Sequence, residues 1–379
     1  MQLVSVEKLQ IGMTTALDVY PHDGGHGIPL VRKNTGLNSY MIRELQERGV
    51  RFVYIKDRSD NTTSANHVFK VHPRNLYVPK PKPIIGTELR GSAVARLQSV
   101  FQAALTGEIH PSSQIVKHID EVVEHLVDSI DQKSLVNIED LKSYDEYTYH
   151  HSLSVAVLAI AIGQHFGYQR TELKRLGKCA IMHDIGKTAV PVEIINKPSN
   201  LDEDEYNLVK GHSSAGYDYL FNGNIGDDKM WAGVLGHHEK VDGTGYPFKL
   251  RGDDIPIWSR IISVADVYDA LTSVRPYRSP MQPAEAIEYI MGGVGSSFDY
   301  DVVSSFVKKV EIYPVGSYVE LSNGVIAVVL NTRNPMRPVV RNLETGDVYD
   351  LQGDRQLLSV VINRVIQSTE LRSLIASAY

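Results

Sequence analysis

The sequence predicts a mainly α-helical protein with a small β-containing module at each end, and three observations support this fold class. Apolar residues in the middle of the chain recur about every three to four positions, as on one face of a helix. Runs near both ends alternate apolar and polar residues, which is typical of half-buried strands. A polar and then proline-rich stretch with Pro79, Pro81 and Pro83 separates the first module from the helices.

Residues 1 to 57 are expected to form a small α/β module. Gly12 and the run at 22–27 mark turns between short strands, Asn38 opens a helix that ends near Gly49, and residues 51–55 alternate as a strand. We interpret this module as a sensory or docking unit to which signalling proteins would bind. Residues 58 to 88 are then a linker, because closely spaced prolines favour an extended backbone.

Residues 89 to 313 should form the helical domain, with its core at 144 to 313. An apolar stripe predicts a helix over 112–131 that packs on this domain or on a second subunit, so a homodimer stays open. The stripe consists of Ile115, Ile119, Val122, Leu126 and Ile130. His118, Glu121 and His125 follow its flank at a spacing that could hold a metal, but a solvated polar face is the commoner outcome.

The next two helices should bring polar side chains into the helical core. A capping box at Ser143 and Glu146 predicts a helix that runs to about residue 166 and points His151 inward. Thr171 should cap the following helix, and Gly186 should end it.

Three more helices are expected to direct imidazole or carboxylate groups at the same interior. The first begins near residue 202 and carries His212, and the second carries His238. Pro256 starts the third, on which Asp266 and Asp269 align. Burying so many polar groups unpaired would cost about 1 to 3 kcal/mol each, a cost that a bound cation removes.

Two short strings contain most of these groups. His183 and Asp184 lead the string His-Asp-Ile-Gly-Lys, and His237 and His238 lead a glycine-rich string that ends in Gly-Tyr-Pro. Imidazole and carboxylate suit borderline divalent metals such as iron, manganese or zinc, whereas glycines let the backbone approach a phosphate closely. Together the strings indicate a metal-dependent phosphohydrolase.

In this order and at this spacing, the strings resemble the HD-GYP family of bacterial cyclic di-GMP phosphodiesterases. The similarity runs from about Tyr144 to Tyr313, with further matches at 147–152, at His212 and at 263–278. It implies an HD-domain helical bundle and hydrolysis of cyclic di-GMP to linear pGpG, with GMP as a further product left open. The nucleophile would be a hydroxide that bridges two metals, so a serine or cysteine nucleophile is not needed.

By the same resemblance, the two divalent metal ions share Asp184. One would be held by His151, His183, Asp184 and Asp266, and the other by Asp184, His212, His237 and His238. Iron or manganese is the expected metal, and zinc, cobalt and nickel stay open because nitrogen and oxygen ligands suit them all.

Some family members hold a third metal through a glutamate four residues before the first histidine ligand, and here Tyr147 occupies that position. A phenol with a pKa near about 10 competes poorly with a glutamate of pKa about 4.3. The neighbouring Glu146 is rotated by about 100° around the helix. We therefore expect two metals per chain.

The resemblance also implies the substrate contacts. Lys187 is expected near the phosphates and, with Asp184, among the catalytic residues. Arg275 and Arg278 would bind phosphate oxygens, for which a guanidinium fork has the right geometry. Gly245 and Tyr246 form the turn of the second string, where Tyr246 would lie against a guanine base, and a purely structural loop is the alternative.

Residues 314 to 379 should form a small β module with a terminal helix. Runs at 317–321, 325–330 and 338–341 predict strands, of which the first two flank a turn at Asn323 and Gly324. The helix is expected from near Val361 to Ala378. The role of this module, like the signal sensed by residues 1 to 57, does not follow from the sequence.

The length, net charge and apolar runs of the chain disfavour several classes of protein. The 379 residues suit two or three domains of about 100 to 200 residues, and the formal net charge of -6 disfavours a binder of DNA or RNA polymers, which needs a broad basic surface. Apolar runs fall short of the roughly 18 residues that span a bilayer, and Met1 to Glu7 lacks a signal-peptide pattern. We therefore expect a cytoplasmic protein, in which the single Cys179 is a small core residue.

Three rival functions remain. The same centre could act on cyclic GMP-AMP or on an ordinary nucleotide, although the Gly-Tyr-Pro string argues against a plain HD nucleotidase. A non-catalytic receptor for cyclic dinucleotides is a rival of another class. The intact metal-ligand positions of this sequence count against it. A scaffolding protein is supported only by the two terminal modules.

Overall fold

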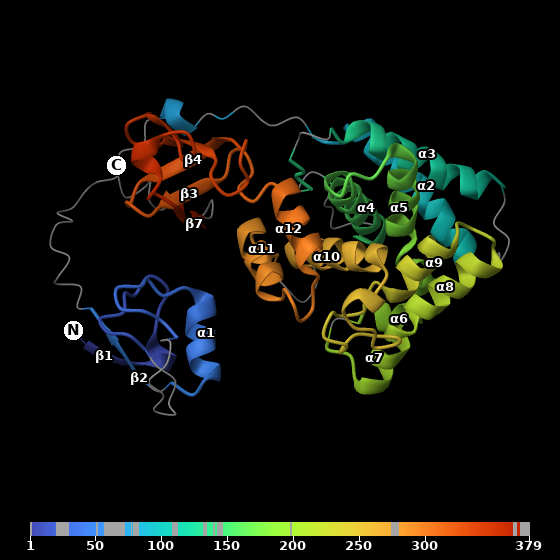
Figure 1. The fold of residues 1–379 in the computed structure, drawn as a ribbon, viewed down its shortest axis with the longest axis horizontal. Helices are drawn as coiled ribbons and strands as arrows, with labels where there is room; N and C mark the ends of the chain where they lie inside the picture. Colours follow the sequence, from blue (N-terminus) through green and yellow to red (C-terminus); the bar gives the residue numbers. More distant parts are fainter. Residues whose placement is uncertain are drawn as a thin grey trace. The chain divides into compact units, whose positions relative to one another are not determined.

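The computed structural model describes residues 2–19, 30–50, 52–56, 73–76, 78, 83–107, 113–131, 135–138, 141, 147–197, 199–273, 280–366 and 370–371. The chain divides into two compact units, Met1–Phe69 and Lys70–Tyr379 (Figure 1). The predicted linker at 58–88 falls largely outside the described residues, so its bounds stay a prediction.

The first unit is a small α/β fold, as expected. Strand β1 (Gln2–Ser5) pairs antiparallel with β2 (Phe52–Ile55), and the 3-10 turn η1 (Val6–Lys8) follows β1. Helix α1 (Ser39–Glu47) begins at the predicted cap, where the Asn38 side chain accepts a hydrogen bond from the Met41 amide. Buried apolar side chains such as Leu37, Leu45 and Val53 give this unit a core of its own.

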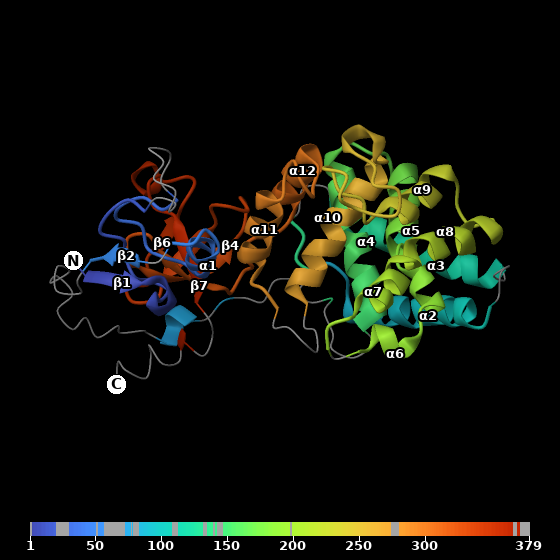
Figure 2. The same ribbon diagram turned by 90° about the horizontal axis from the view of Figure 1, so that it is seen from below.

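The second unit is mainly helical, which confirms the predicted fold class. Its helices gather into one bundle (Figures 1 and 2). In chain order they are α2 (Thr87–Leu105), α3 (Ser113–Ser129), α4 (Tyr147–His165), α5 (Arg170–Met182), α6 (Val192–Ile195), α7 (Glu203–Lys210), α8 (His212–Asn222), α9 (Asp228–Gly236), α10 (Ile257–Thr272), α11 (Pro283–Gly292) and α12 (Tyr300–Lys309). Within the described ranges, no helix has both the length and the apolar character that a membrane crossing requires.

Helix α4 lies at the centre of the bundle. Every side chain from Leu153 to Ile162 is buried, because this run is apolar on all sides of the helix except for Ser154. α4 packs against α2, α5, α10 and α12. The predicted capping box at Ser143 and Glu146 lies outside the described residues.

The predicted bounds of α5 are wrong. Its N-cap is Gln169 rather than Thr171, because Gln169 has an extended backbone and its carbonyl accepts the first helical hydrogen bond from Leu173. The helix ends at Met182, before Gly186, which lies in the 3-10 turn η5 (Ile185–Ala189). A glycine is not needed to stop α5, because the imidazole of the next residue bonds a carbonyl of its last turn.

The helix expected from residue 202 is two helices. α7 begins after Asp202, whose side chain forms a capping box with Glu205, and it ends at Lys210. Gly211 separates it from α8, whose first residue is His212. α10 begins directly after Pro256, as predicted.

The expected stripe on α3 is buried against the bundle rather than left for a second subunit. Ile119, Val122 and Leu126 are covered by packing of α3 on α2 and α5. Its polar flank forms surface contacts, since Glu121 pairs with Arg96 of α2 and His125 is exposed. Helix α2 was not predicted, because its many small and polar residues give a weak apolar stripe.

The C-terminal module is a five-stranded antiparallel sheet with the order β6-β5-β4-β3-β7. Its strands are β3 (Tyr318–Leu321), β4 (Ile326–Asn331), β5 (Val339–Asn342), β6 (Val348–Asp350) and β7 (Ile362–Ile366). The three predicted strands are confirmed, but the helix expected from Val361 is wrong over β7. There the chain pairs with β3, aligning Ile366 with Tyr318, and such long-range pairing overrides the local helical pattern. Residues 372–379 lie outside the described part.

Because the two units have separate cores, deletion of residues 1 to 69 should leave the second unit folded. The shortened chain keeps Asn75, whose side chain donates a hydrogen bond to the Leu343 carbonyl of the C-terminal module. We expect one cooperative thermal transition with a midpoint close to that of the full chain, and unchanged metal content after loading. A soluble, folded fragment that no longer takes up metal would contradict this expectation.

Candidate metal centre

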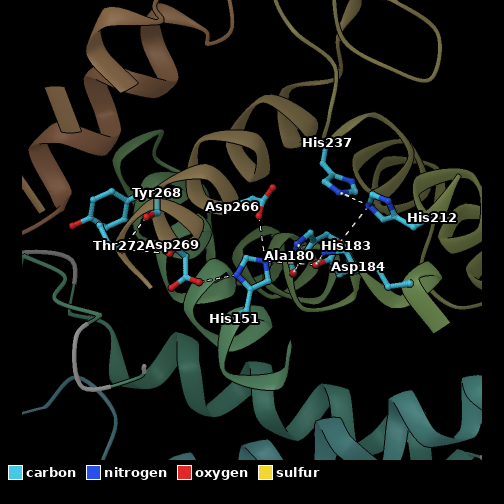
Figure 3. Close-up of polar contacts among 11 residues, drawn as sticks. His151, Ala180, His183, Asp184, His212, His237, Asp266, Tyr268, Asp269 and Thr272 are labelled. Carbon is cyan, nitrogen blue, oxygen red and sulfur yellow. Dashed lines mark hydrogen bonds and ion pairs between the residues drawn. The ribbon is translucent and has the colours of Figure 1, made fainter. Parts of the chain in front are cut away.

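The seven predicted metal ligands converge on one interior of the helical bundle. All of them except His238 are labelled in Figure 3. They come from α4, from the end of α5, from the start of α8, from the segment after α9 and from α10. Among the described residues, three groups have ligand atoms within 4.8 Å of one another: His212 with His237 and His238, His151 with His183 and Asp266, and His183 with Asp184 and His237. The polar flank of α3 is not one of these groups.

Three of the histidines are oriented by the helix that precedes them. The Nδ1 atoms of His183, His212 and His237 lie 2.7, 2.6 and 2.6 Å from the carbonyl oxygens of Ala180, Val209 and Val234. These carbonyls belong to the last turns of α5, α7 and α9, where helical carbonyls generally lack the amide partner that the helix interior provides. Because Nδ1 is then the donor, each ring turns the lone pair of Nε2 toward the interior.

His151 is oriented by a carboxylate instead. Its Nδ1 lies 2.7 Å from Oδ2 of Asp269, and its Nε2 lies 3.2 Å from Oδ1 of Asp266 (Figure 3). Burial opposes a charge on this ring, but the hydrogen bonds to Asp266 and Asp269 raise the pKa of His151 to about 9. In the absence of a cation the ring therefore holds a proton at neutral pH.

Asp184 lies between the two sets of imidazoles. Its Oδ2 is 3.3 Å from Nε2 of His183 and 2.6 Å from Nζ of Lys187, whereas its Oδ1 is 3.4 Å from Nε2 of His212. Burial would raise the pKa of Asp184, but the contact with His183 and the Lys187 ammonium hold it well below its usual range. The side chain is thus an ionised carboxylate that is only 2% exposed.

Burial favours the neutral form of His212, His237 and His238. Burial lowers the pKa of His212 and His237, and it lowers the pKa of His238 to about 3. Neutral imidazoles have a free lone pair for a metal, so the protonation state of this set suits metal binding at neutral pH.

Two further observations fit a cation in this interior. Nε2 of His212 and Nε2 of His237 are 3.3 Å apart, although both rings use Nδ1 as the donor, so two lone pairs face each other. Nε2 of His183 and Oδ1 of Asp184 are buried without a hydrogen-bond partner among the described residues. A divalent cation would satisfy all four atoms, and a set of imidazole and carboxylate donors suits iron, manganese or zinc.

The glycine-rich loop supports His238. The Tyr246 ring stacks on His238 with a centroid distance of 4.8 Å, and burial raises the pKa of its phenol above the usual range. Gly245 lets the loop fold back on itself, because a Cβ there would lie 2.4 Å from the amide nitrogen of Lys240. The structure thus gives this loop a packing role, and contacts of Gly245 and Tyr246 with a substrate stay predictions.

Lys187 reaches the centre, whereas Arg275 and Arg278 lie outside the described residues. The Lys187 ammonium binds Asp184, and its side chain is 33% exposed, so it connects the buried carboxylate with the surface. Cys179 is fully buried, as expected for a core residue, and the deprotonated form of its thiol is disfavoured by burial.

Two residues at the centre were given no role from the sequence. Asp269 binds His151, and its alignment with Asp266 on α10 was the available signal. Glu239 is buried and accepts hydrogen bonds from the amides of Phe248 and Leu250, which fixes the glycine-rich loop. Its place directly after two histidines carries no signal for that role.

The family model described as the HD domain matches residues 135–302. A cyclic di-GMP phosphodiesterase of Pseudomonas aeruginosa is 38% identical over 238 residues, which cover 63% of this chain and 57% of that protein. A cyclic di-GMP phosphodiesterase response regulator of Xanthomonas campestris is 32% identical over 235 residues, 60% of each chain.

A 3'3'-cGAMP-specific phosphodiesterase of Vibrio cholerae is 35% identical over 178 residues, 47% of this chain and 38% of that protein. The chain therefore spans about 38 to 60% of the length of these three relatives. The matches confirm the resemblance that the two sequence strings predict.

Replacement of the central carboxylate tests the geometry directly. Asp184→Ala should lower the metal content of both halves of the centre, since its two oxygens face different imidazoles. Loss of an outer partner of a metal ligand costs about 10- to 100-fold in affinity, so loss of a shared ligand should cost more. Elemental analysis after dialysis is the measurement, with the exposed Asp218→Ala on α8 as matched control. Full metal content in Asp184→Ala would refute its central position.

Proposed function

We propose that this chain, whose residues 135–302 match the family model described as the HD domain, is a metal-dependent phosphodiesterase that hydrolyses cyclic di-GMP to linear pGpG. The observation that carries the proposal is the buried Asp184 carboxylate, each oxygen of which faces imidazole nitrogens from different helices. The printed activities of the Pseudomonas and Xanthomonas relatives support the choice of substrate.

The proposed ligand sets follow the two sides of Asp184. One cation would bind His151, His183, Asp184 and Asp266, and the second would bind Asp184, His212, His237 and His238. Two groups of close ligand atoms support the division, His151 with His183 and Asp266, and His212 with His237 and His238, while a third group, His183 with Asp184 and His237, joins the two sets at Asp184. We expect iron or manganese, and two cations rather than three, because Tyr147 stands where a third cation would need a glutamate.

When bound, the two cations supply an activated water and neutralise charge on the attacking and leaving oxygens. The side chains of the protein would position the metal ligands and bind the substrate. Lys187 holds Asp184 and offers its partly exposed ammonium to a phosphate at the mouth of the centre. Tyr246 fixes the ring plane of His238, and its other face would meet a guanine base. Arg275 and Arg278 would bind phosphate oxygens.

Hydrolysis of a 3'3'-linked cyclic GMP-AMP is the alternative, and the activity of the Vibrio relative supports it. The two substrates share the phosphodiester ring and differ in one base. A receptor without catalysis is disfavoured, because a receptor does not need a buried carboxylate held between two sets of imidazoles.

A product assay tests the proposal. Protein loaded with manganese or ferrous iron should convert cyclic di-GMP to pGpG, and pGpG should accumulate before GMP, since two cations suit the first cut better than the second. Chromatography of timed samples is the measurement, with cyclic GMP-AMP at equal concentration and the Asp184→Ala variant as controls. Binding of cyclic di-GMP without any product would support the receptor, and preferential loss of cyclic GMP-AMP would reassign the substrate.

The arginine pair provides a separate test. Arg275→Ala and Arg278→Ala should each raise KM about tenfold or more, because a charge-assisted hydrogen bond contributes about 1.5 to 3 kcal/mol. Metal content should stay unchanged, since the phosphate contacts lie outside the ligand sets. Lys249→Ala, an exposed cation in the glycine-rich loop, serves as control. Unaltered steady-state kinetics in both arginine variants would remove these residues from the substrate site.

A further inference from the structure

His151 differs from the other oriented histidines in what holds its Nδ1 atom. His183, His212 and His237 use neutral backbone carbonyls, whereas His151 uses the Asp269 carboxylate at 2.7 Å (Figure 3). Asp269 is 1% exposed, one helical turn after Asp266 on α10. A carboxylate in this position fixes the tautomer of the imidazole and makes its other nitrogen a stronger donor to a metal.

The charges of the two halves are also unequal. Asp184, Asp266 and Asp269 all surround His151, and the first two lie 3.6 and 3.2 Å from its Nε2 atom. The other half contains the imidazoles of His212, His237 and His238 and shares only the carboxylate of Asp184. A divalent cation is attracted more strongly where more carboxylates are buried, because a low-dielectric interior screens them little.

We propose that Asp269 is a positioning residue that makes the two halves unequal, so that the half with His151 binds a divalent cation first and more tightly. This inference rests on the two-cation centre of the proposed function. Asp269 would not touch the cation or the substrate. It acts through His151, by holding the ring with Nε2 toward Asp266 and by adding negative charge behind it.

The backbone of Asp269 has an ordinary helical role that does not involve its side chain. Its carbonyl accepts a hydrogen bond from the Ser273 amide at the end of α10. Replacement of the side chain therefore leaves the helix termination intact. Asp269→Asn keeps the volume and can still accept a hydrogen bond from Nδ1, but it removes the charge. Asp269→Ala removes both.

The experiment is a titration of metal-free full-length protein with Co²⁺, followed by visible absorbance and by competition with a chelator. The unaltered chain should bind two equivalents in two steps. Asp269→Ala should weaken the tighter step by about 10- to 100-fold, and Asp269→Asn should weaken it less. The weaker step should be the same in all three proteins. Asp242→Asn, in the glycine-rich loop, is the matched control, because its carboxylate accepts hydrogen bonds from the amide and hydroxyl of Thr244 and belongs to neither proposed ligand set.

Different outcomes would contradict the two-cation centre and the role of Asp269. Binding of a single equivalent by the unaltered chain would overturn the two-cation centre itself. Two unequal steps that persist unchanged in both Asp269 variants would overturn the role of Asp269 alone. Equal weakening of both steps would also overturn it, since that indicates a general loss of structure. Circular dichroism of the metal-free variants checks their fold, and Asp269→Asn keeps the test available if Asp269→Ala does not fold.

Discussion

The buried, ionised carboxylate of Asp184 is the constraint on which the rest of the centre depends. A charge that is 2% exposed must be compensated on every side, and here the compensation comes from Lys187 on one oxygen and from imidazole nitrogens on both. The helices that supply these partners must end where they do. The fold can therefore be understood as an arrangement of helix ends around one anion.

Helix ends suit this purpose because they leave carbonyl groups unsatisfied. The rings of His183, His212 and His237 satisfy carbonyls in the last turns of α5, α7 and α9, and their orientation follows from backbone geometry rather than from long-range packing. Close approach of these ends needs Gly186, where a Cβ would lie 2.0 Å from the carbonyl oxygen of His212. Gly186, which follows Asp184 by two residues, thus allows this turn to lie directly against the start of α8.

Periodicity and motif spacing predicted the bundle and the residues that meet in it, because both depend on local sequence. Features that depend on contacts between distant residues were missed. Gln169 rather than Thr171 starts α5, and Ile366 lies in a strand because β3 is available to pair with it. The partner of His151 was not predicted, since Asp269 is 118 positions away in the sequence and alignment on one helix does not reveal what faces it.

The scatter of the ligands along the chain has a thermodynamic consequence. In an unfolded chain only the adjacent pairs His183-Asp184 and His237-His238 are close enough to share a cation, whereas the folded chain brings α4 and α10 to the same point. Cations therefore bind the native state far better than the denatured ensemble, and by mass action each adds its binding free energy to the stability of the fold. With the proposed cations bound, the stability of the fold would therefore depend on the concentration of free metal.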